Sequence, residues 1–217
     1  QTGEGGVIVT NDKKIYEKLQ LIRNHAEAVV EDKGVNDLVN MVGYNFRLGE
    51  IESAIGIEQL KKLSIYLNKR QKIANQLNEG LKNLNGLKIP ETKNNCSHAY
   101  YIYGMVLDLN IIGIGRDKIK KALQAEGVEG LISGYANIHL LPIFQKKIAY
   151  GSKGFPWSSD ICKREIDYNK GICPVAEELH DKTFLGYEMC LHNLNEKDTN
   201  LIIDAFKKVW NNLDELR

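Results

Sequence analysis

Residues 43–60 of this chain read GYNFRLGEIESAIGIEQL, and this stretch decides the fold. From Gly49 onward, apolar residues recur at helical spacing, which predicts a helix with one buried side. Just before it stand an amide, Asn45, and a guanidinium, Arg47, which can hydrogen-bond phosphate or carboxylate oxygens. At a helix entrance the backbone dipole also favours an anion. The stretch therefore predicts an anion-binding segment, although Asn45 can also be a helix cap and Arg47 a surface residue.

The chain begins with QTGEGGVIVT, residues 1–10, in which three glycines precede a β-branched run. This pattern predicts a tight turn followed by a strand at residues 7–10. A glycine loop that cradles phosphate needs a helix N-terminus directly after the glycines. Because a strand is expected there instead, we exclude a Walker or Rossmann-type nucleotide loop.

In this order and at this separation, the two segments resemble the DegT/DnrJ/EryC1/StrS family of sugar aminotransferases, which use pyridoxal phosphate. The resemblance implies that the Schiff-base lysine lies a few residues before GEGG, residues 3–6, and therefore before residue 1. Gln1 stands where an initiator methionine would. We therefore expect a fragment that lacks its catalytic residue and is inactive alone. Some members carry histidine at the lysine position and act as sugar dehydratases. The sequence leaves open whether the parent protein is an aminotransferase or a dehydratase.

The resemblance also implies the site residues. The position that matches Asn45 reaches across the dimer interface to the cofactor phosphate, and Arg47 lies in the same shared site. His139 stands in NIHLLP, residues 137–142, which is similar to the Pro-Leu-His-x-x-Pro stretch that lines the sugar-nucleotide pocket of the family. Here Asn137 replaces the first proline. A single histidine in an aromatic loop is more often a hydrogen-bonded packing residue, so that reading of His139 stays open.

Composition limits the partners. Lys plus Arg (29) nearly balances Asp plus Glu (28), so no strong global field favours nucleic acid or an anionic membrane. No apolar run approaches the roughly 20 residues that span a bilayer. The four cysteines show no zinc-type spacing, and we expect no metal site. We expect them to be buried reduced thiols in a cytoplasmic protein.

Hydrophobic periodicity outlines the rest of the chain. Helices are predicted from Asp12, from Gly49, over residues 66–84 and 116–127, and after Asn195; strands are predicted near residues 100–109 and 184–191. A loop at 26–42 and an exposed excursion at 151–170 separate them. The predicted fold class is α/β with an α+β small domain. Residues 1–64 would be the C-terminal part of a large cofactor domain, and residues 65–217 a small C-terminal domain with a short antiparallel sheet and helices.

The function implied by the resemblance is transfer of an amino group from glutamate or glutamine to a keto sugar nucleotide, in a homodimer with a shared active site. Such a reaction would serve the synthesis of amino sugars for surface polysaccharide or a secondary metabolite. Two readings of other classes remain. The chain can be a dimerisation or regulatory module, or an unrelated α/β binding domain whose glycine-rich start is coincidental. In isolation we expect it to self-associate, because its apolar helix faces lack partners.

Overall fold

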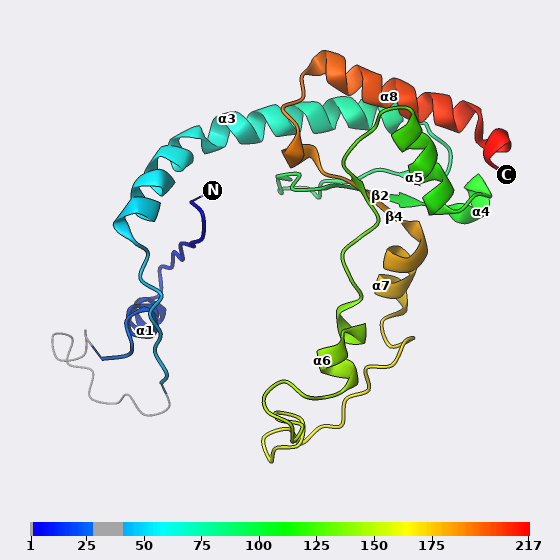
Figure 1. The fold of residues 1–217 in the computed structure, drawn as a ribbon. Helices are drawn as coiled ribbons and strands as arrows, with labels where there is room; N and C mark the ends of the chain where they lie inside the picture. Colours follow the sequence, from blue (N-terminus) through cyan, green and yellow to red (C-terminus); the bar gives the residue numbers. More distant parts are fainter. Residues whose placement is uncertain (1, 28–40) are drawn as a thin grey trace. The chain divides into compact units, whose positions relative to one another are not determined.

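The computed structural model describes residues 2–27 and 41–217 (Figure 1). Its internal contacts divide the chain into two compact units, Gln1–Tyr66 and Leu67–Arg217. Most of the loop expected at 26–42 lies outside the described residues. The assignment of residues 1–64 to a large cofactor domain stays a prediction.

The first unit contains helix α1, Lys13–Arg23. It begins where the sequence predicts, because the Asp12 carboxylate accepts hydrogen bonds from the backbone amides of Lys14 (2.8 Å) and Ile15 (3.1 Å). The strand predicted at residues 7–10 is absent from the described part of the chain, and that prediction was wrong. The β-branched residues there are exposed and pair with no other described strand. Strand propensity forms no strand without a neighbour to complete the hydrogen-bond ladder.

Helix α3, Glu50–Leu81, joins the two helices that the sequence predicts separately. No proline interrupts it, so the two apolar patterns share one continuous backbone. From Ile73 onward its apolar side chains are buried. Toward its start they are exposed, including four that were predicted to face inward: Ile51, Ile55, Ile57 and Leu60. These side chains, which were expected to face inward, are exposed in the described residues, as expected for apolar helix faces that lack partners.

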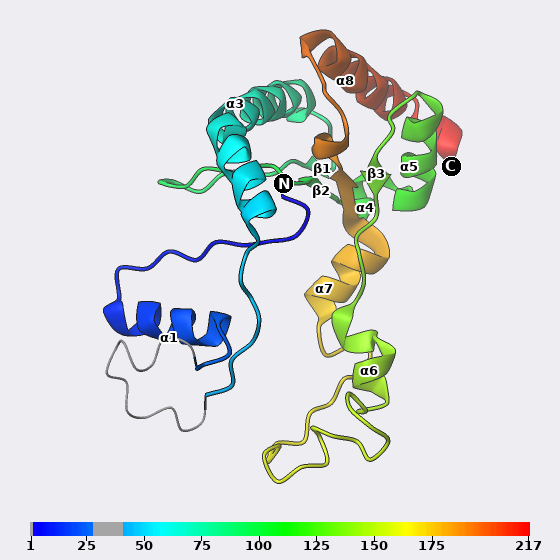
Figure 2. The same ribbon diagram turned by 60° about the vertical axis from the view of Figure 1, so that its left-hand side comes forward.

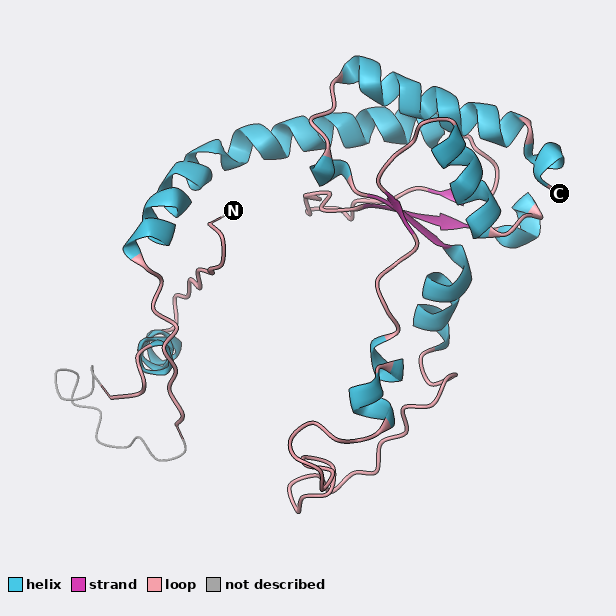
Figure 3. Ribbon diagram, viewed as in Figure 1, coloured by secondary structure: helices cyan, strands magenta, loops and turns pink. Residues whose placement is uncertain are grey.

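The second unit is built on a four-stranded antiparallel sheet in the order β1-β2-β4-β3 (Figure 3). Its strands are β1 Leu87–Lys88, β2 Tyr103–Leu107, β3 Leu131–Ile132 and β4 Phe184–Tyr187. Met105 lies opposite Leu185 in the central pair. The predicted class, mixed helices with a short antiparallel sheet, is confirmed.

Three helices complete the core with the sheet: the second half of α3, α5 at Arg116–Ala125 and α8 at Glu196–Asn211. Helix α8 starts at a capping box in which the side chains of Asn195 and Asp198 bond to each other's backbone amides. Gly80 lets α3 approach α8 closely, because a Cβ there would lie 2.6 Å from Ile203. The largest fully buried side chains include Tyr103, Phe206 and Leu123. Short turns of helix flank the core: α4 Leu109–Ile112, η3 Met189–Leu191 and η4 Leu213–Leu216.

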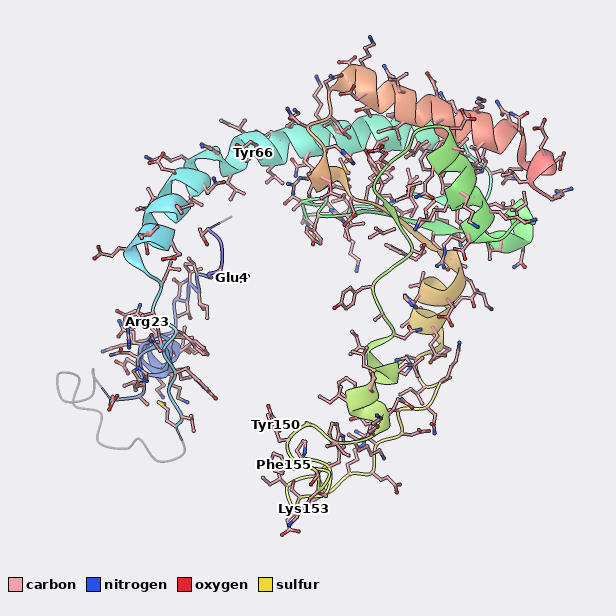
Figure 4. All side chains as sticks on the ribbon, viewed as in Figure 1. Glu4, Arg23, Tyr66, Tyr150, Lys153 and Phe155 are labelled. Carbon is pink, nitrogen blue, oxygen red and sulfur yellow. The ribbon has the colours of Figure 1, made fainter. Side chains whose placement is uncertain are left out.

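Residues 133–183 lie outside this core, and we call them the arm. They contain the short helices η1 Ile138–Leu140, α6 Pro142–Gln145, α7 Pro174–Glu178 and the π-helical turn η2 Leu179–Thr183. Both views of the ribbon show α6 and the loop after it lying away from the sheet (Figures 1 and 2). The chain reverses at Tyr150–Phe155, whose side chains Figure 4 labels. The exposed excursion predicted at 151–170 belongs to this region.

The structure bears on two expectations from composition, one about the cysteines and one about membrane-spanning helices. All four cysteines are free thiols, but none is buried: Cys96 and Cys190 are exposed, and Cys162 and Cys173 are half-buried. The prediction of buried thiols was wrong because the cysteines fall in loops and short turns instead of the core. Within the described ranges, no helix combines the length and apolarity that crossing a bilayer requires.

Candidate functional site

The segment that begins at Gly43 is held against the end of α1 by its backbone. Tyr44 donates its amide to the Ile22 carbonyl (2.7 Å) and accepts from the His25 amide (3.0 Å). A Cβ at Gly43 would lie 2.1 Å from the backbone nitrogen of Ala26. Only glycine fits this close approach, so Gly43 fixes where the following residues lie.

Beyond Gly43 the side chains alternate. Tyr44 and Phe46 stack with ring centroids 4.8 Å apart and planes 12° from parallel. Asn45 forms an isolated antiparallel bridge with Asn24, so its backbone is extended. Because successive side chains of an extended segment point to opposite sides, Asn45 and Arg47 share the side away from the aromatic pair. The two predicted polar groups thus belong to one face.

A local hydrogen bond orients the Arg47 guanidinium. Its Nη1 donates to Oδ1 of Asn24, 2.6 Å away. Asn45 and Arg47 are both exposed, so their N–H donors face solvent and are accessible to an anion. A phosphate group fits this donor set in chemistry, since an amide and a guanidinium both hydrogen-bond phosphate oxygens.

The entrance of α3 lies farther along the chain. Its first hydrogen bond runs from the Ser53 amide to the Gly49 carbonyl (2.9 Å), so Gly49 and not Asn45 is the capping residue. The first turn already carries Glu50 and Glu52, whose carboxylates complement the helix dipole. The dipole acts over about one turn, so it does not reach Asn45. The extended segment, and not the helix entrance, presents the two donors.

His139 lies in the arm, in the second unit. Its Nε2 is 2.8 Å from Oε1 of Glu177, and the two side chains are only 9% and 8% exposed. The same carboxylate accepts the Gly171 amide at 2.8 and 2.9 Å and the Cys173 amide at 3.3 Å. The Gly171 amide above all, and then the His139 ring, hold the pKa of Glu177 below its usual value. His139 is therefore a hydrogen-bonded, nearly buried residue beside an ionised carboxylate.

Sequence reasoning gave Glu177 no role. The stretch Cys173-Pro174-Val175-Ala176-Glu177 resembles one branch of the family, and its proline stands at the first position of α7, but neither signal points to the carboxylate. An acidic residue in the first turn of a helix is ordinary, and its partners His139 and Gly171 are distant or backbone groups. A single sequence offers no sign of such a pairing.

Arg116 was also missed. The sequence predicts only that a helix begins at residue 116; the N-cap of α5 is Gly115, and the Arg116 side chain, 8% exposed, turns inward. Its guanidinium donates to four backbone carbonyls, those of His180 (2.6 Å), Asp181 (3.3 Å), Ser133 (3.3 Å) and Phe184 (3.5 Å). Carbonyls at a helix end lack intrahelical donors, and a guanidinium with five N–H groups can satisfy several at once. Arg116 therefore ties the base of the arm to the sheet.

The predicted site residues thus divide between the units, with Asn45 and Arg47 in the first and His139 in the second. Comparison with known proteins gives these residues their context. The sequence model of the DegT/DnrJ/EryC1/StrS aminotransferase family matches residues 1–181. The chain belongs to this family. The resemblance drawn from residues 1–10 and 43–60 is confirmed, and the reading as an unrelated binding domain is wrong.

Two curated relatives illustrate the match. A Methanocaldococcus jannaschii protein, MJ1066, whose name carries no function, is 30% identical over 172 residues, 76% of this chain and 44% of its own length. A UDP-4-amino-4,6-dideoxy-N-acetyl-β-L-altrosamine transaminase from Helicobacter pylori is 42% identical over 73 residues, 34% of this chain and 19% of its own length. The chain thus spans about half the length, or less, of the curated relatives that it matches.

A solved structure shows the same fold. The solved structure of PseC from Helicobacter pylori, an aminotransferase involved in the biosynthesis of pseudoaminic acid, superposes with a TM-score of 0.64 at 22% identity. The match covers 97% of this chain and 50% of PseC. Arm and sheet core are therefore parts of a known fold.

Proposed function

We propose that this chain is about half of a pyridoxal-phosphate-dependent aminotransferase that moves an amino group from glutamate or glutamine to a keto sugar nucleotide. The observation that carries the proposal is the family match over residues 1–181, which includes both the GEGG turn and the Gly43–Arg47 segment. The name of the Helicobacter pylori relative, a UDP-sugar transaminase, supports a sugar nucleotide as substrate.

The extended segment would hold the cofactor by its phosphate. The Asn45 amide and the Arg47 guanidinium offer donors on one face, and Asn24 restrains Arg47. When bound, pyridoxal phosphate supplies an electron sink that stabilises negative charge on the substrate carbon. We assign Asn45 to the phosphate and Arg47 to the substrate side of the same site, shared between the subunits of a homodimer. His139 is the third proposed residue, in the stretch that would line the sugar-nucleotide pocket.

Isotope transfer tests the reaction. The complete enzyme, incubated with a keto sugar nucleotide and glutamate labelled with ¹⁵N at the amino group, should release an amino sugar nucleotide that carries the label, detected by mass spectrometry. A dehydratase would instead yield a product that has lost water and contains no label. Either that product or unchanged sugar nucleotide with every keto sugar tried would overturn the proposed transamination.

Cofactor affinity tests Asn45. Asn45→Ala removes a hydrogen bond to a charged group, which is expected to weaken pyridoxal phosphate binding about 10- to 150-fold in a fluorescence titration. Asn68→Ala changes an exposed asparagine of α3 and should leave the affinity unchanged. Equal affinities in the two variants would remove Asn45 from the cofactor site.

A further inference from the structure

The arm has little apolar core of its own. Several of its large apolar side chains are exposed, among them Tyr135 (91%), Ile138, Ile143, Ile148 and Val175. Yet its outgoing limb, residues 133–145, and its returning limb, residues 168–183, run beside each other (Figures 1 and 2). One aromatic contact joins the limbs, because Phe144 lies 5.3 Å from Tyr168 between ring centroids and Trp157 packs against both. Nearer the sheet, polar contacts hold the limbs together.

Side-chain hydrogen bonds provide these contacts at three levels. At the base, Arg116 joins the Ser133 carbonyl of the outgoing limb to the carbonyls of His180 and Asp181. Next, the Asp181 carboxylate accepts from Asn137 Nδ2 (3.1 Å) and Lys170 Nζ (2.7 Å).

The third level is the Glu177 carboxylate, where both limbs meet on one group. It bonds to the His139 ring from the outgoing limb and to the amides of Gly171 and Cys173 from the returning limb. Immediately beyond it, Gln145 Nε2 donates to the carbonyls of His139 (2.8 Å) and Tyr168 (2.7 Å). The Glu177 carboxylate is nearly buried, and its contact with His139 joins the limbs while its contacts with Gly171 and Cys173 fix the turn of the returning limb that carries it.

The chemistry of this position requires a carboxylate. Oε1 lies against the His139 ring and accepts from the Gly171 and Cys173 amides, and Oε2 also accepts from the Gly171 amide. A glutamine has the same shape but only one accepting oxygen, and its NH₂ group would meet an N–H donor. An unpaired donor in a site this closed to solvent costs free energy that no other contact restores.

We propose that Glu177 is a positioning residue: it fixes the His139 ring and locks the two limbs, so that the arm presents a preformed surface to the sugar nucleotide. The substrate part of this inference rests on the proposed function. Pre-ordering the arm lowers the entropy cost that binding would otherwise carry. Loss of Glu177 should therefore weaken sugar-nucleotide binding more than it slows the chemical step.

Glu177→Gln tests the lock, with Glu178→Gln as matched control. Glu178 is the next residue of α7, is half exposed, and its carboxylate lies 3.0 Å from Lys182 Nζ at the surface. In Glu177→Gln, hydrogen exchange should accelerate about tenfold or more, the equivalent of one lost hydrogen bond, at the Gly171 amide, which faces both oxygens, and at the Leu140 and Leu141 amides beside His139 on the outgoing limb. In Glu178→Gln it should stay at the wild-type rate. Unchanged exchange in Glu177→Gln would overturn the lock.

Kinetics of the complete enzyme tests the positioning role. In Glu177→Gln the KM for the keto sugar nucleotide should rise about tenfold, while the half-reaction with the amino donor keeps its rate. Accelerated exchange with an unchanged KM would reduce Glu177 to a purely structural residue and overturn the role. If the wild-type enzyme showed no transamination, the proposed function would be refuted. The hydrogen-exchange result would still show whether Glu177 holds the two limbs together.

A second variant covers the case in which Glu177→Gln fails to fold. Gln145→Ala removes the adjacent tie between the His139 and Tyr168 carbonyls and leaves no buried charge. It should raise the same KM by a smaller factor. If the folded Gln145→Ala enzyme matched the wild type in both exchange and KM, the limbs would not depend on these ties, and the inference would fail.

Discussion

The sheet core and the arm belong to one compact unit, yet different forces hold them. In the core, apolar side chains from β2, β4, α5 and α8 are almost completely removed from water. In the arm, many apolar side chains are exposed, and apart from the aromatic contacts around Trp157, a few polar groups, chiefly Arg116, Asp181 and Glu177, join the limbs. Burial is non-directional and distributed over many contacts, whereas each polar tie depends on a single partner. A substitution should therefore have a broad effect in the core and a local effect in the arm.

The largest effect is expected in the core. Phe206 is 1% exposed and stacks on Trp210. Phe206→Ala should lower the free energy of unfolding by about 3–5 kcal/mol, through lost burial and the cavity that remains. Urea denaturation followed by circular dichroism measures it. Leu201→Ala, at an exposed position of the same helix, should change it by no more than about 0.5 kcal/mol. Equal losses in both variants would show that the core is not where stability resides.

A smaller effect is expected at the base of the arm. Arg116→Met keeps much of the side-chain volume but leaves the carbonyls of His180 and Asp181 without their donor, which should cost about 1–3 kcal/mol. The loss should appear as faster proteolysis within residues 146–170 while the core keeps its urea midpoint. Lys121→Met, at an exposed position of the same helix, is the control and should be cleaved at the wild-type rate. A lowered core midpoint in Arg116→Met would mean that arm and core unfold together.

The smallest effect is the pH dependence of the Glu177 tie. Its pKa is held below the ordinary 4.5 by the Gly171 amide and the His139 ring. A lowered pKa in the folded state contributes stability that is present above the unfolded value and is lost as the pH falls through the folded value. The difference in arm stability between wild type and Glu177→Gln should therefore stay constant above the unfolded value of 4.5 and shrink as the pH falls below it.

Asp181, whose pKa Lys170 lowers, is present in both proteins, so its contribution cancels in this difference. The rate at which an acid-stable protease cleaves the arm, measured at each pH for wild type and Glu177→Gln, reports the difference in arm stability between the two proteins. A difference that stays constant over the whole range would show that the Glu177 carboxylate does not titrate with the arm.

The contrast between core and arm also explains what the sequence could predict. Helix α8 was predictable because Asn195 marks its start and its apolar residues repeat at helical spacing over four turns. Strand β2 lies inside the predicted range 100–109. Strands β1 and β3 have two residues each, which is too short for any period to emerge. The sequence therefore predicted only the longer strands of the sheet.

The candidate site follows the same rule. Asn45 and Arg47 were found because they stand in one contiguous stretch with Gly43, whose role is local. Glu177 and Arg116 were missed because their partners lie far along the chain or are backbone groups, which leave no mark in the sequence. At residues 7–10 the opposite happened: the local sequence predicts a strand, but no described strand pairs with these residues, so none forms.

The central claim, that the arm is a separately held region, has a direct test because one tryptophan lies in each region. Trp157 packs in the arm against Phe144 and Tyr168, and Trp210 stacks on Phe206 in the core. The variants Trp210→Phe and Trp157→Phe each leave one of these two reporters. Urea unfolding of both is followed by fluorescence, with circular dichroism of the same sample as reference. The account predicts that the Trp157 signal changes at lower urea and with a smaller slope than the Trp210 signal, because less surface is exposed when the arm opens. Coincident midpoints and slopes for the two tryptophans would contradict it.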